Sequence, residues 1–347
     1  MSPAEQPSAA ADVRRPTLNA VAARAGVGRG TVSRVINGSP KVSDRSRAAV
    51  EQAIADLGYV PNRAARSLVT RRTDSVALVV PEAETRLFSE PYFSEIIRGV
   101  SARLSGTGMQ LLLVMVDNEK EYARLATYLS AQRVDGVLMM AVHSDDTLPD
   151  RLEELSVPTV LAGRRGRREP LGHVRADNSG GARVAVQHLL ARGRRSIGTI
   201  TGPLDMDAAR ARLDGYREAL EGAGLTVDED LVAHGDFTEE GGRAAMRELL
   251  RRRPGLDAVF AASDVMASGA VLELRASGRR VPDDVAVVGF DDSIVARHID
   301  PPLTSVRQPL EEMGRTMAGL LLDEIAQRGS GHREVVLPTQ LVVRESA

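Results

Sequence analysis

Near the N-terminus, apolar side chains recur every three or four positions in three short runs separated by glycines. Such spacing predicts amphipathic helices over residues 17–25, 29–37 and 44–57. Gly26 and Gly58 are suitable ends for the first and the third. The apolar positions that would form their common core are Leu18, Val21, Ala22, Ala25, Val27, Val32, Val35, Ile36, Val50, Ile54 and Leu57. The short turn between the first two helices predicts a helix-turn-helix unit.

From residue 75 onward, the pattern changes to apolar runs of strand length that alternate with amphipathic stretches. The runs are continuous, which is typical of parallel strands buried on both faces. The expected strands cover residues 75–80, 110–116, 136–140, 159–161, 196–200, 258–261 and 285–290. The expected helices cover residues 93–104, 122–132, 182–192, 208–223, 242–252 and 265–276. This alternation predicts a doubly wound α/β fold, and its length fits two sheets rather than one.

Charge divides the chain at the same place as the hydrophobic pattern. Residues 14–72 contain twelve Lys or Arg and three Asp or Glu, a formal charge of +9. The whole chain carries −2, so the remainder carries −11. A basic head on an acidic body directs polyanion binding to one end of the molecule. A basic surface that is merely solvated is the alternative, but here the charge coincides with a motif that enters DNA grooves.

The second expected helix carries hydrogen-bonding side chains on the face opposite its apolar positions. They are Arg29, Thr31, Ser33, Arg34 and Asn37, and each can reach base edges or phosphate oxygens. A helix with only a structural role rarely needs so many donors on one face. The sequence therefore predicts that this helix reads double-stranded DNA.

Longer motifs point to a family. Two stretches, Thr17 to Gly38 and Leu57 to Leu68, carry the strongest similarity. It continues through the body at Pro91-Tyr92-Phe93 with Gly99, Val134 to Val137, Asp177-Asn178, Gly202-Pro203, Arg212 with Gly215-Tyr216, Ser263-Asp264, Gly289 to Asp292 and Pro302 to Gln308. With these motifs, the chain closely resembles the LacI/GalR family of bacterial transcriptional repressors. Residues 1–16 fall outside the similarity, and their Ala, Ser and Pro content predicts disorder.

The resemblance implies a helix-turn-helix domain over residues 17–61, a hinge helix and linker over 62–74, and a ligand-binding and dimerisation core over 75–347. The core is expected to be periplasmic-binding-protein-like, with two α/β lobes. Three crossovers would join these lobes, near residues 176 and 306 and before the last strand.

In the head, the resemblance assigns DNA contacts to eight positions. They are Thr17, Leu18, Arg29, Gly30, Thr31, Ser33, Arg34 and Asn37. Where family members commonly place Ser, this chain has Gly28, an N-cap weaker by only a few tenths of a kcal/mol. Arg29 and Gly30 occupy positions that vary within the family, so the operator sequence does not follow from a relative.

The hinge can be interpreted in the same way. Residues 63–69 are far fewer than the ~12 to 15 that an isolated helix needs in water, so they should be unfolded away from DNA. In the family, paired hinges fold in the minor groove and insert a leucine between base steps. Leu68 matches that leucine, Asn62 and Ala65 flank it, and Arg66 can reach phosphate. A plain linker with one exposed Leu is the alternative.

Polar and aromatic residues that follow the expected strands are candidates for a ligand site, because ligands of such sheets bind beyond the carboxyl ends of the strands. These candidates are Phe88, Tyr92, Arg164, Arg212, Ser263, Asp264, Asp291 and Gln308. Phe88 and Tyr92 offer an apolar platform for a sugar ring, whereas we expect Phe93 and Phe290 in the core.

Two of the candidates match positions that hold ligand hydroxyls across the family, Arg212 and Asp291. A guanidinium fork and a carboxylate can each grip two adjacent hydroxyls of a sugar. Alternatives remain open at this stage. Asp291 could cap the following turn, Arg212 could be an exposed charge of its helix, and Arg164 lies in a basic run.

Several features are missing from the sequence. No segment reaches the ~18 consecutive apolar residues of a membrane span, and the N-terminus lacks the apolar run of a signal peptide, so we expect a cytoplasmic protein. The chain has no Cys, and its six His show no ligand spacing. The pair Asp291-Asp292 lacks a third carboxylate at ligand spacing. We therefore expect neither a metal nor a cofactor.

The favoured function is a ligand-responsive transcriptional repressor that binds a pseudo-palindromic operator. A solute-binding sugar receptor without a transcriptional role is the alternative, but it would need an export signal and has no use for residues 17–68. An enzyme is the third class, and no set of nucleophile, base and orienting group is evident.

The assembly and the effector follow from further resemblances. The chain stops at Ala347, directly after the apolar run 340–343, without the leucine heptad that lac-type tetramers add, so a homodimer is expected. The tract 21–31, with residues 89–93, resembles actinobacterial members that respond to cello-oligosaccharides or other β-glucosides. A mono- or oligosaccharide effector is implied, while the residues leave open whether it acts as inducer or co-repressor.

Overall fold

The computed structural model describes residues 16–60, 72–82, 90–116, 118–131, 133–327 and 333–347. The chain divides into two compact units, Met1–Thr73 and Asp74–Ala347, which we call the head unit and the core unit. Several predicted site residues lie outside the described residues, namely Asn62, Ala65, Arg66, Leu68 and Phe88.

The head unit contains three helices, α1 (Leu18–Ala25), α2 (Arg29–Ile36) and α3 (Asp44–Leu57). The side chain of Thr17 caps α1 by accepting a hydrogen bond from the backbone N–H of Ala20 at 3.3 Å. Gly26 ends α1 with a left-handed φ of 65°, which favours glycine. The predicted helix-turn-helix is confirmed, with a small core formed by buried Val21, Val32, Val35, Val50 and Ala53.

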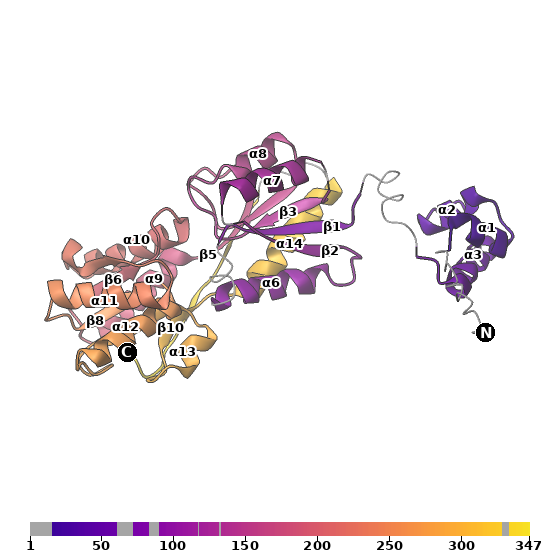
Figure 1. Cartoon of the computed structure of the whole chain (residues 1–347). Coiled ribbons are helices and arrows are strands. Elements are labelled where there is room, and N and C mark those ends of the chain that lie inside the picture. The colour runs from indigo at the N-terminus through magenta and orange to yellow at the C-terminus, as the bar shows by residue number, and fades with distance from the viewer. Residues whose placement is uncertain (1–15, 61–71, 83–89, 117, 132, 328–332) are drawn as a thin grey trace, which may run out of the picture. The chain divides into compact units, whose positions relative to one another are not determined.

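The core unit consists of two lobes, each built on a six-stranded sheet. Lobe 1 contains β1 (Ser75–Val80), α6 (Pro91–Leu104), β2 (Gln110–Met115), α7 (Glu119–Ser130), β3 (Gly136–Met139), α8 (Leu148–Glu154), β4 (Thr159–Ala162), β5 (Gly172–Ala176), α14 (Leu310–Gln327) and β11 (Glu334–Leu337). Its strand order is β11-β5-β4-β3-β1-β2, and every pairing is parallel. Helices α6 and α14 cover one face of this sheet, and α7 and α8 cover the other (Figure 1).

Lobe 2 repeats this plan. It contains α9 (Asn178–Ala191), β6 (Ile197–Thr201), α10 (Asp207–Gly222), a 3₁₀ turn (Glu229–Leu231), β7 (Val232–His234), α11 (Glu239–Arg252), β8 (Ala258–Ala261), α12 (Asp264–Ala276), β9 (Ala286–Asp291), α13 (Ile294–His298), β10 (Thr304–Arg307) and β12 (Gln340–Val342). The strand order is β12-β10-β9-β8-β6-β7, and β12 runs antiparallel to β10. Helices α9 and α10 pack on one face, and α11 and α12 pack on the other. The predicted doubly wound α/β fold is confirmed.

Burial on both faces explains the continuous apolar runs of the sequence. In β1, Val76, Leu78 and Val80 pack toward α6 and α14. The intervening Ala77 and Val79 pack against the residues of α7 and α8. Successive side chains of a strand point to opposite faces, so both faces need apolar residues.

The chain passes between the lobes three times. It leaves lobe 1 after β5 to enter α9, returns after β10 to form α14, and crosses again between β11 and β12. These three short segments lie together and connect the lobes, as the ribbon shows (Figure 1). Among the described residues, no helix has the length and apolar character of a membrane span.

All six expected helices of the core unit begin one to four residues earlier than the hydrophobic pattern indicates, and two of them show why. Helix α6 starts at Pro91 rather than Phe93, because proline suits the first turn of a helix. Helix α7 starts at Glu119 rather than Tyr122, because the side chain of Asn118 accepts a hydrogen bond from Glu121 N at 3.0 Å. The added residues at the starts of α6 and α7 are polar or capping residues, which a pattern of apolar positions does not detect.

Candidate functional site

The outer face of α2 presents the hydrogen-bonding residues that the sequence places there. Arg29, Arg34 and Asn37 are exposed, whereas Thr31 and Ser33 are half-buried. Within the described residues, neither arginine forms a hydrogen bond or an ion pair, so both guanidinium groups remain available to an external anion or base. This surface has the chemistry needed for base edges and phosphates.

Other basic residues of the head unit have structural partners. Arg24 forms a salt bridge with Asp56 at 2.6 Å, which ties α1 to α3. Arg47 donates to the backbone carbonyl of Ser39 at 2.8 Å. Leu18 is half-buried against the core of the head unit, so its side chain supports packing there. Among the described residues, the head therefore has both arginines with structural partners, such as Arg24 and Arg47, and arginines without them, such as Arg29 and Arg34 on α2.

A cavity in the core unit lies at the carboxyl ends of strands from both lobes. It encloses about 710 Å³, part of it open to solvent, which is within the size range of small-molecule sites. Six of the predicted ligand residues line it, namely Tyr92, Arg164, Arg212, Ser263, Asp291 and Gln308. The structure thus brings together side chains that are up to 216 positions apart in the sequence, from Tyr92 to Gln308.

Arg212 lies in the second turn of α10 and is only 5% exposed, so it is not a surface charge. Its Nε donates to Asn178 Oδ1 at 2.9 Å, and its Nη1 donates to the carbonyl of Ala262. Its guanidinium carbon lies 3.8 Å from the ring centroid of Phe290. Burial lowers the pKa of Arg212, and the charge of Asp291 opposes this change. Among the described residues Nη2 has no hydrogen-bond partner, so it is available to a ligand.

Asp291 ends β9 and faces Arg212, with 3.9 Å between Asp291 Oδ1 and Arg212 Nη1. Gln308 Nε2 donates to the same carboxylate at 2.6 Å. Burial raises the pKa of the Asp291 carboxyl, whereas Arg212 and Gln308 act in the opposite direction. Its backbone has a φ of 113°, a strained value for a residue with a side chain. Strain and a buried carboxyl at one position are typical of a functional site.

The prediction for Asp264 needs correction. Asp264 is fully buried and does not belong to the cavity wall. Its carboxylate accepts hydrogen bonds from Ser305 Oγ at 2.5 Å and from Ser293 N at 2.7 Å. Burial and the charge of Asp291 raise the pKa of this carboxyl. Asp264 starts α12 directly after Ser263, and the helix turns its side chain into lobe 2, where it fixes the segments that flank Asp291.

Arg164 connects the two walls of the cavity. It follows β4 of lobe 1, and its Nε donates at 3.0 Å to Asp207, the first residue of α10 in lobe 2. Arg175 lines the same wall and donates to Glu334 at 2.8 Å. The alternative that Arg164 is an ordinary solvated charge is not supported, because its side chain is only 21% exposed.

The sequence reasoning missed several polar and aromatic lining residues, among them Glu90, Arg175, Asn178, Asp207 and Phe237. Asn178 follows β5 in the same way as the predicted residues follow their strands, so the same rule would have found it. Phe237 follows β7, which has three residues and gives no recognisable apolar run. Tyr92, Phe93 and Phe237 supply the aromatic surface of the cavity. Phe93 and Phe290 are buried, as predicted.

The charges of the cavity wall balance. Three guanidinium groups, from Arg164, Arg175 and Arg212, face three carboxylates, from Glu90, Asp207 and Asp291. Such a wall offers hydrogen-bond donors and acceptors without a net charge. Among the described residues, no cluster of His, Asp or Glu could hold a metal ion.

A helix-turn-helix unit with free arginines, in one chain with a two-lobed domain around a cavity lined by charged and apolar residues, defines a ligand-responsive DNA-binding regulator. Comparison with family models gives matches to both parts. Residues 17–62 match the model for bacterial regulatory proteins of the lacI family, and residues 186–347 match a periplasmic binding protein-like domain.

Curated relatives cover nearly the whole chain. The HTH-type transcriptional regulator CelR of Thermobifida fusca is 57% identical over 340 residues, covering 96% of this chain and 98% of the relative. The HTH-type transcriptional repressor PurR of Edwardsiella ictaluri (strain 93-146) is 37% identical over 334 residues, covering 95% and 96%. The chain therefore belongs to the lacI family of bacterial regulatory proteins.

Solved structures agree with this conclusion. A transcriptional regulator CelR-cellobiose complex matches with a TM-score of 0.78 and 55% identity, covering 96% of this chain and 100% of that chain. The lac repressor dimer bound to operator and the anti-inducer ONPF matches with a TM-score of 0.83 and 29% identity, covering 96% and 99%. The predicted family is confirmed, and a sugar receptor without a DNA-binding head is no longer an alternative.

Proposed function

We propose that this protein is a transcriptional repressor that binds a pseudo-palindromic operator as a homodimer and is released by a neutral oligosaccharide, with cellobiose as the expected effector. The observation that carries the choice of effector is the balanced wall of the cavity, with three arginines and three carboxylates beside aromatic rings. An anionic ligand would leave a buried negative excess, whereas a neutral sugar satisfies both kinds of polar group.

The comparison with CelR supports this effector. The solved CelR-cellobiose complex is similar over 96% of this chain, which favours the same class of effector here. Aromatic side chains suit the apolar C–H face of a sugar ring, and Tyr92 and Phe237 provide them here. A purine effector fits less well, because it offers few groups to match so many donors and acceptors.

Within the cavity, we assign the direct contacts to the residues whose polar atoms remain available. Arg212 and Asp291 grip adjacent hydroxyls, and Gln308 and Ser263 extend this polar surface. Arg164 contacts the ligand from lobe 1, and Tyr92 packs on a sugar ring, with Phe88 assigned the same role from the sequence. Asp264 acts indirectly, by fixing the backbone around Asp291.

On DNA, the head enters the major groove with α2. Arg29, Thr31, Ser33, Arg34 and Asn37 contact bases or phosphates, and Gly30 lets the backbone approach closely. Thr17 and Leu18, at the start of α1, contact the DNA backbone. From the sequence, Leu68 is assigned to the minor groove, with Asn62 and Ala65 beside it and Arg66 on phosphate. A regulator of this kind acts on the chromosome, hence in the cytoplasm, and we assign it no catalytic role.

Isothermal titration calorimetry of the full chain tests the effector. Cellobiose is expected to bind most tightly, glucose more weakly because it has one sugar ring instead of two, and glucose 6-phosphate and hypoxanthine not measurably. Binding of glucose 6-phosphate in place of cellobiose would show that the charge argument is wrong, and binding of hypoxanthine in its place would show that the effector is not a sugar.

A further inference from the structure

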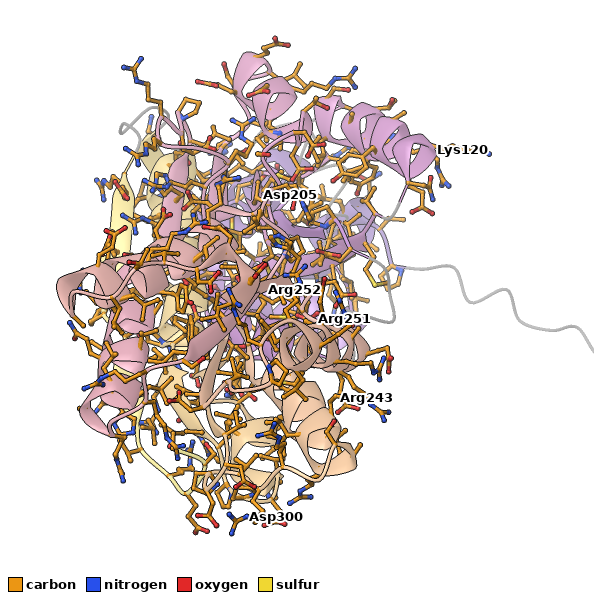
Figure 2. The ribbon with its side chains drawn as sticks, turned by 90° about the vertical axis from the view of Figure 1, so that its left-hand side faces the viewer. Lys120, Asp205, Arg243, Arg251, Arg252 and Asp300 are labelled. Atoms are coloured by element: carbon orange, nitrogen blue, oxygen red, sulfur yellow. The ribbon has the colours of Figure 1, made fainter. Side chains whose placement is uncertain are left out.

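The two lobes also meet beside the cavity, at residues that do not line it. The segment 204–210 of lobe 2 reaches the loops that follow β3 and β4 in lobe 1. His143 and Asp205 belong to this contact, and neither is part of the cavity wall. Figure 2, in which Asp205 is labelled, shows this side of the molecule.

His143 lies between carboxylates of the two lobes. Its Nδ1 is 2.5 Å from Asp205 Oδ2 of lobe 2, and its Nε2 is 3.4 Å from Glu82 Oε1, which follows β1 of lobe 1. The backbone N–H of the next residue, Ser144, donates to the carbonyl of Asp205 at 3.0 Å. A protonated imidazole can donate to both carboxylates at once, whereas a neutral imidazole can donate to only one.

The loop that carries His143 is fixed to lobe 1. Asp146 accepts a hydrogen bond from His143 N at 2.8 Å and another from the hydroxyl of Tyr122 at 3.3 Å. The imidazole therefore belongs to lobe 1 with Glu82, and Asp205 is the group that approaches or leaves when the lobes move. A second contact nearby joins Arg210 Nη2 of lobe 2 to the carbonyl of Arg165 at 3.2 Å.

We propose that His143 and Asp205 are positioning residues that hold the two lobes closed over the effector without touching it, and that closure takes up a proton at His143. Effector binding thereby becomes dependent on pH. The inference rests on the proposed function only for the choice of cellobiose as the probe.

The electrostatic surroundings of His143 support this coupling. Among the described residues, the charges that act on His143 are the carboxylates of Glu82 and Asp205 and, on its own loop, of Asp146, next to which Asp145 lies. The charge of Arg210 acts on the Asp205 carboxyl. The hydrogen bond to Glu82 raises the pKa of His143, burial lowers it, and Asp205 raises it further, to about 9. Burial opposes ionisation of Asp205, but the hydrogen bond and charge of His143 lower the pKa of its carboxyl.

When the lobes open, Asp205 moves away from His143, whereas Glu82 stays beside it. The pKa of His143 would then fall toward its ordinary value of 6.5. Because the closed form has the higher pKa, its extra stabilisation is present at low pH and is lost as pH rises toward about 9. From low pH to high pH, the affinity for effector should fall tenfold for each unit by which the pKa of His143 in the closed form exceeds its pKa in the open form.

Calorimetry of the full chain with cellobiose, at about pH 8 in two buffers of different ionisation enthalpy, measures the protons taken up on binding. We expect an uptake between zero and one proton per protomer, and affinity that falls between pH 7 and pH 10. In His143→Gln the uptake should disappear and the pH profile should flatten. In Asp205→Asn, which keeps a hydrogen-bond acceptor, uptake should fall and affinity should weaken several-fold.

His298→Gln is the matched control. His298 is exposed, and its ring contacts only the Ile294 carbonyl of its own helix among the described residues. This variant should keep the parental uptake and pH profile. Equal uptake in the parent protein and in His143→Gln would overturn the proposal, since the proton would then bind elsewhere.

An effector-independent measurement separates this proposal from the choice of cellobiose. Histidine-labelled protein gives the pKa of His143 by NMR titration, with the signal assigned by its loss in His143→Gln. We expect Asp205→Asn to lower that pKa in the intact chain. An unchanged pKa would refute the contact between the lobes, whereas absence of cellobiose binding by the parent protein would refute only the proposed effector.

Discussion

Arg212 stacks on Phe290, with its guanidinium carbon 3.8 Å from the ring centroid. One residue lies on α10 and the other on β9, so the contact joins two segments of lobe 2 at the floor of the cavity. The aromatic face and the two hydrogen bonds to Asn178 and Ala262 fix the guanidinium before a ligand arrives. Because the guanidinium of Arg212 is already fixed, binding a ligand hydroxyl costs less conformational entropy.

The neighbouring aspartates Asp291 and Asp292 should have opposite roles. Asp291→Ala should abolish the response to effector and leave operator affinity nearly intact, because the two sites lie in separate units. It should also lower stability, because its removal leaves the buried guanidinium of Arg212 without its counter-charge. DNA binding with and without cellobiose measures the response, and urea unfolding measures the loss of stability.

Asp292→Ala is the contrasting variant. The buried Asp292 carboxylate pairs with Arg307 at 2.7 Å, with Arg297 at 3.7 Å and with Arg344, so its loss removes a partner from three cations. Arg307 is half-exposed, so we expect a loss of only about 2 kcal/mol in the free energy of unfolding, below the range for fully buried pairs. If Asp291→Ala keeps the parental response to effector, the functional assignment of Asp291 is wrong.

Arg29→Ala should relax specificity at one symmetric operator position by about 1 to 3 kcal/mol. The reason is that Arg29 is exposed on α2 and has no partner among the described residues. Arg24→Ala is the matched control, because Arg24 is bound to Asp56 and should not discriminate between bases. Binding to a library of single-base operator variants measures the effect. A uniform loss on all sequences would assign Arg29 to phosphate.

Gly99 permits close contact between α6 and α14 in lobe 1. A Cβ at Gly99 would lie 2.0 Å from the backbone carbonyl oxygen of Glu311, so the helices would have to separate. We expect Gly99→Ala to lower the free energy of unfolding by about 1 to 3 kcal/mol. In Gly222→Ala, at the end of α10, the new methyl group meets no atom within 4 Å and stability should not fall. Urea denaturation distinguishes the two variants.

The sequence predicted best those features that follow from a single physical rule. Helical periodicity and capping identified all three helices of the head, and the rule that ligands bind beyond strand ends led to Tyr92, Arg164, Arg212, Ser263, Asp291 and Gln308 on one cavity wall. The role of each in ligand binding stays a prediction. Asp264 was misplaced because the direction of a side chain at a helix start depends on tertiary packing.

Contacts between distant segments could not be found in this way. Phe237 follows a strand too short to recognise, and its left-handed φ of 68° depends on its tertiary setting. The pairing of His143 with Asp205 joins two loops 62 positions apart, neither of which carries a motif. Such pairs follow from how two lobes approach each other, which no local pattern encodes.

Release of operator DNA by the effector tests the central claim most directly. An operator recovered from fragmented host DNA is labelled, and the fluorescence anisotropy of its complex with the full-length protein is followed as cellobiose is added. We predict that the complex dissociates with a midpoint close to the calorimetric dissociation constant, and that the Asp291→Ala complex stays intact. Specific DNA binding that saturating cellobiose leaves unchanged in the parent protein would contradict the account.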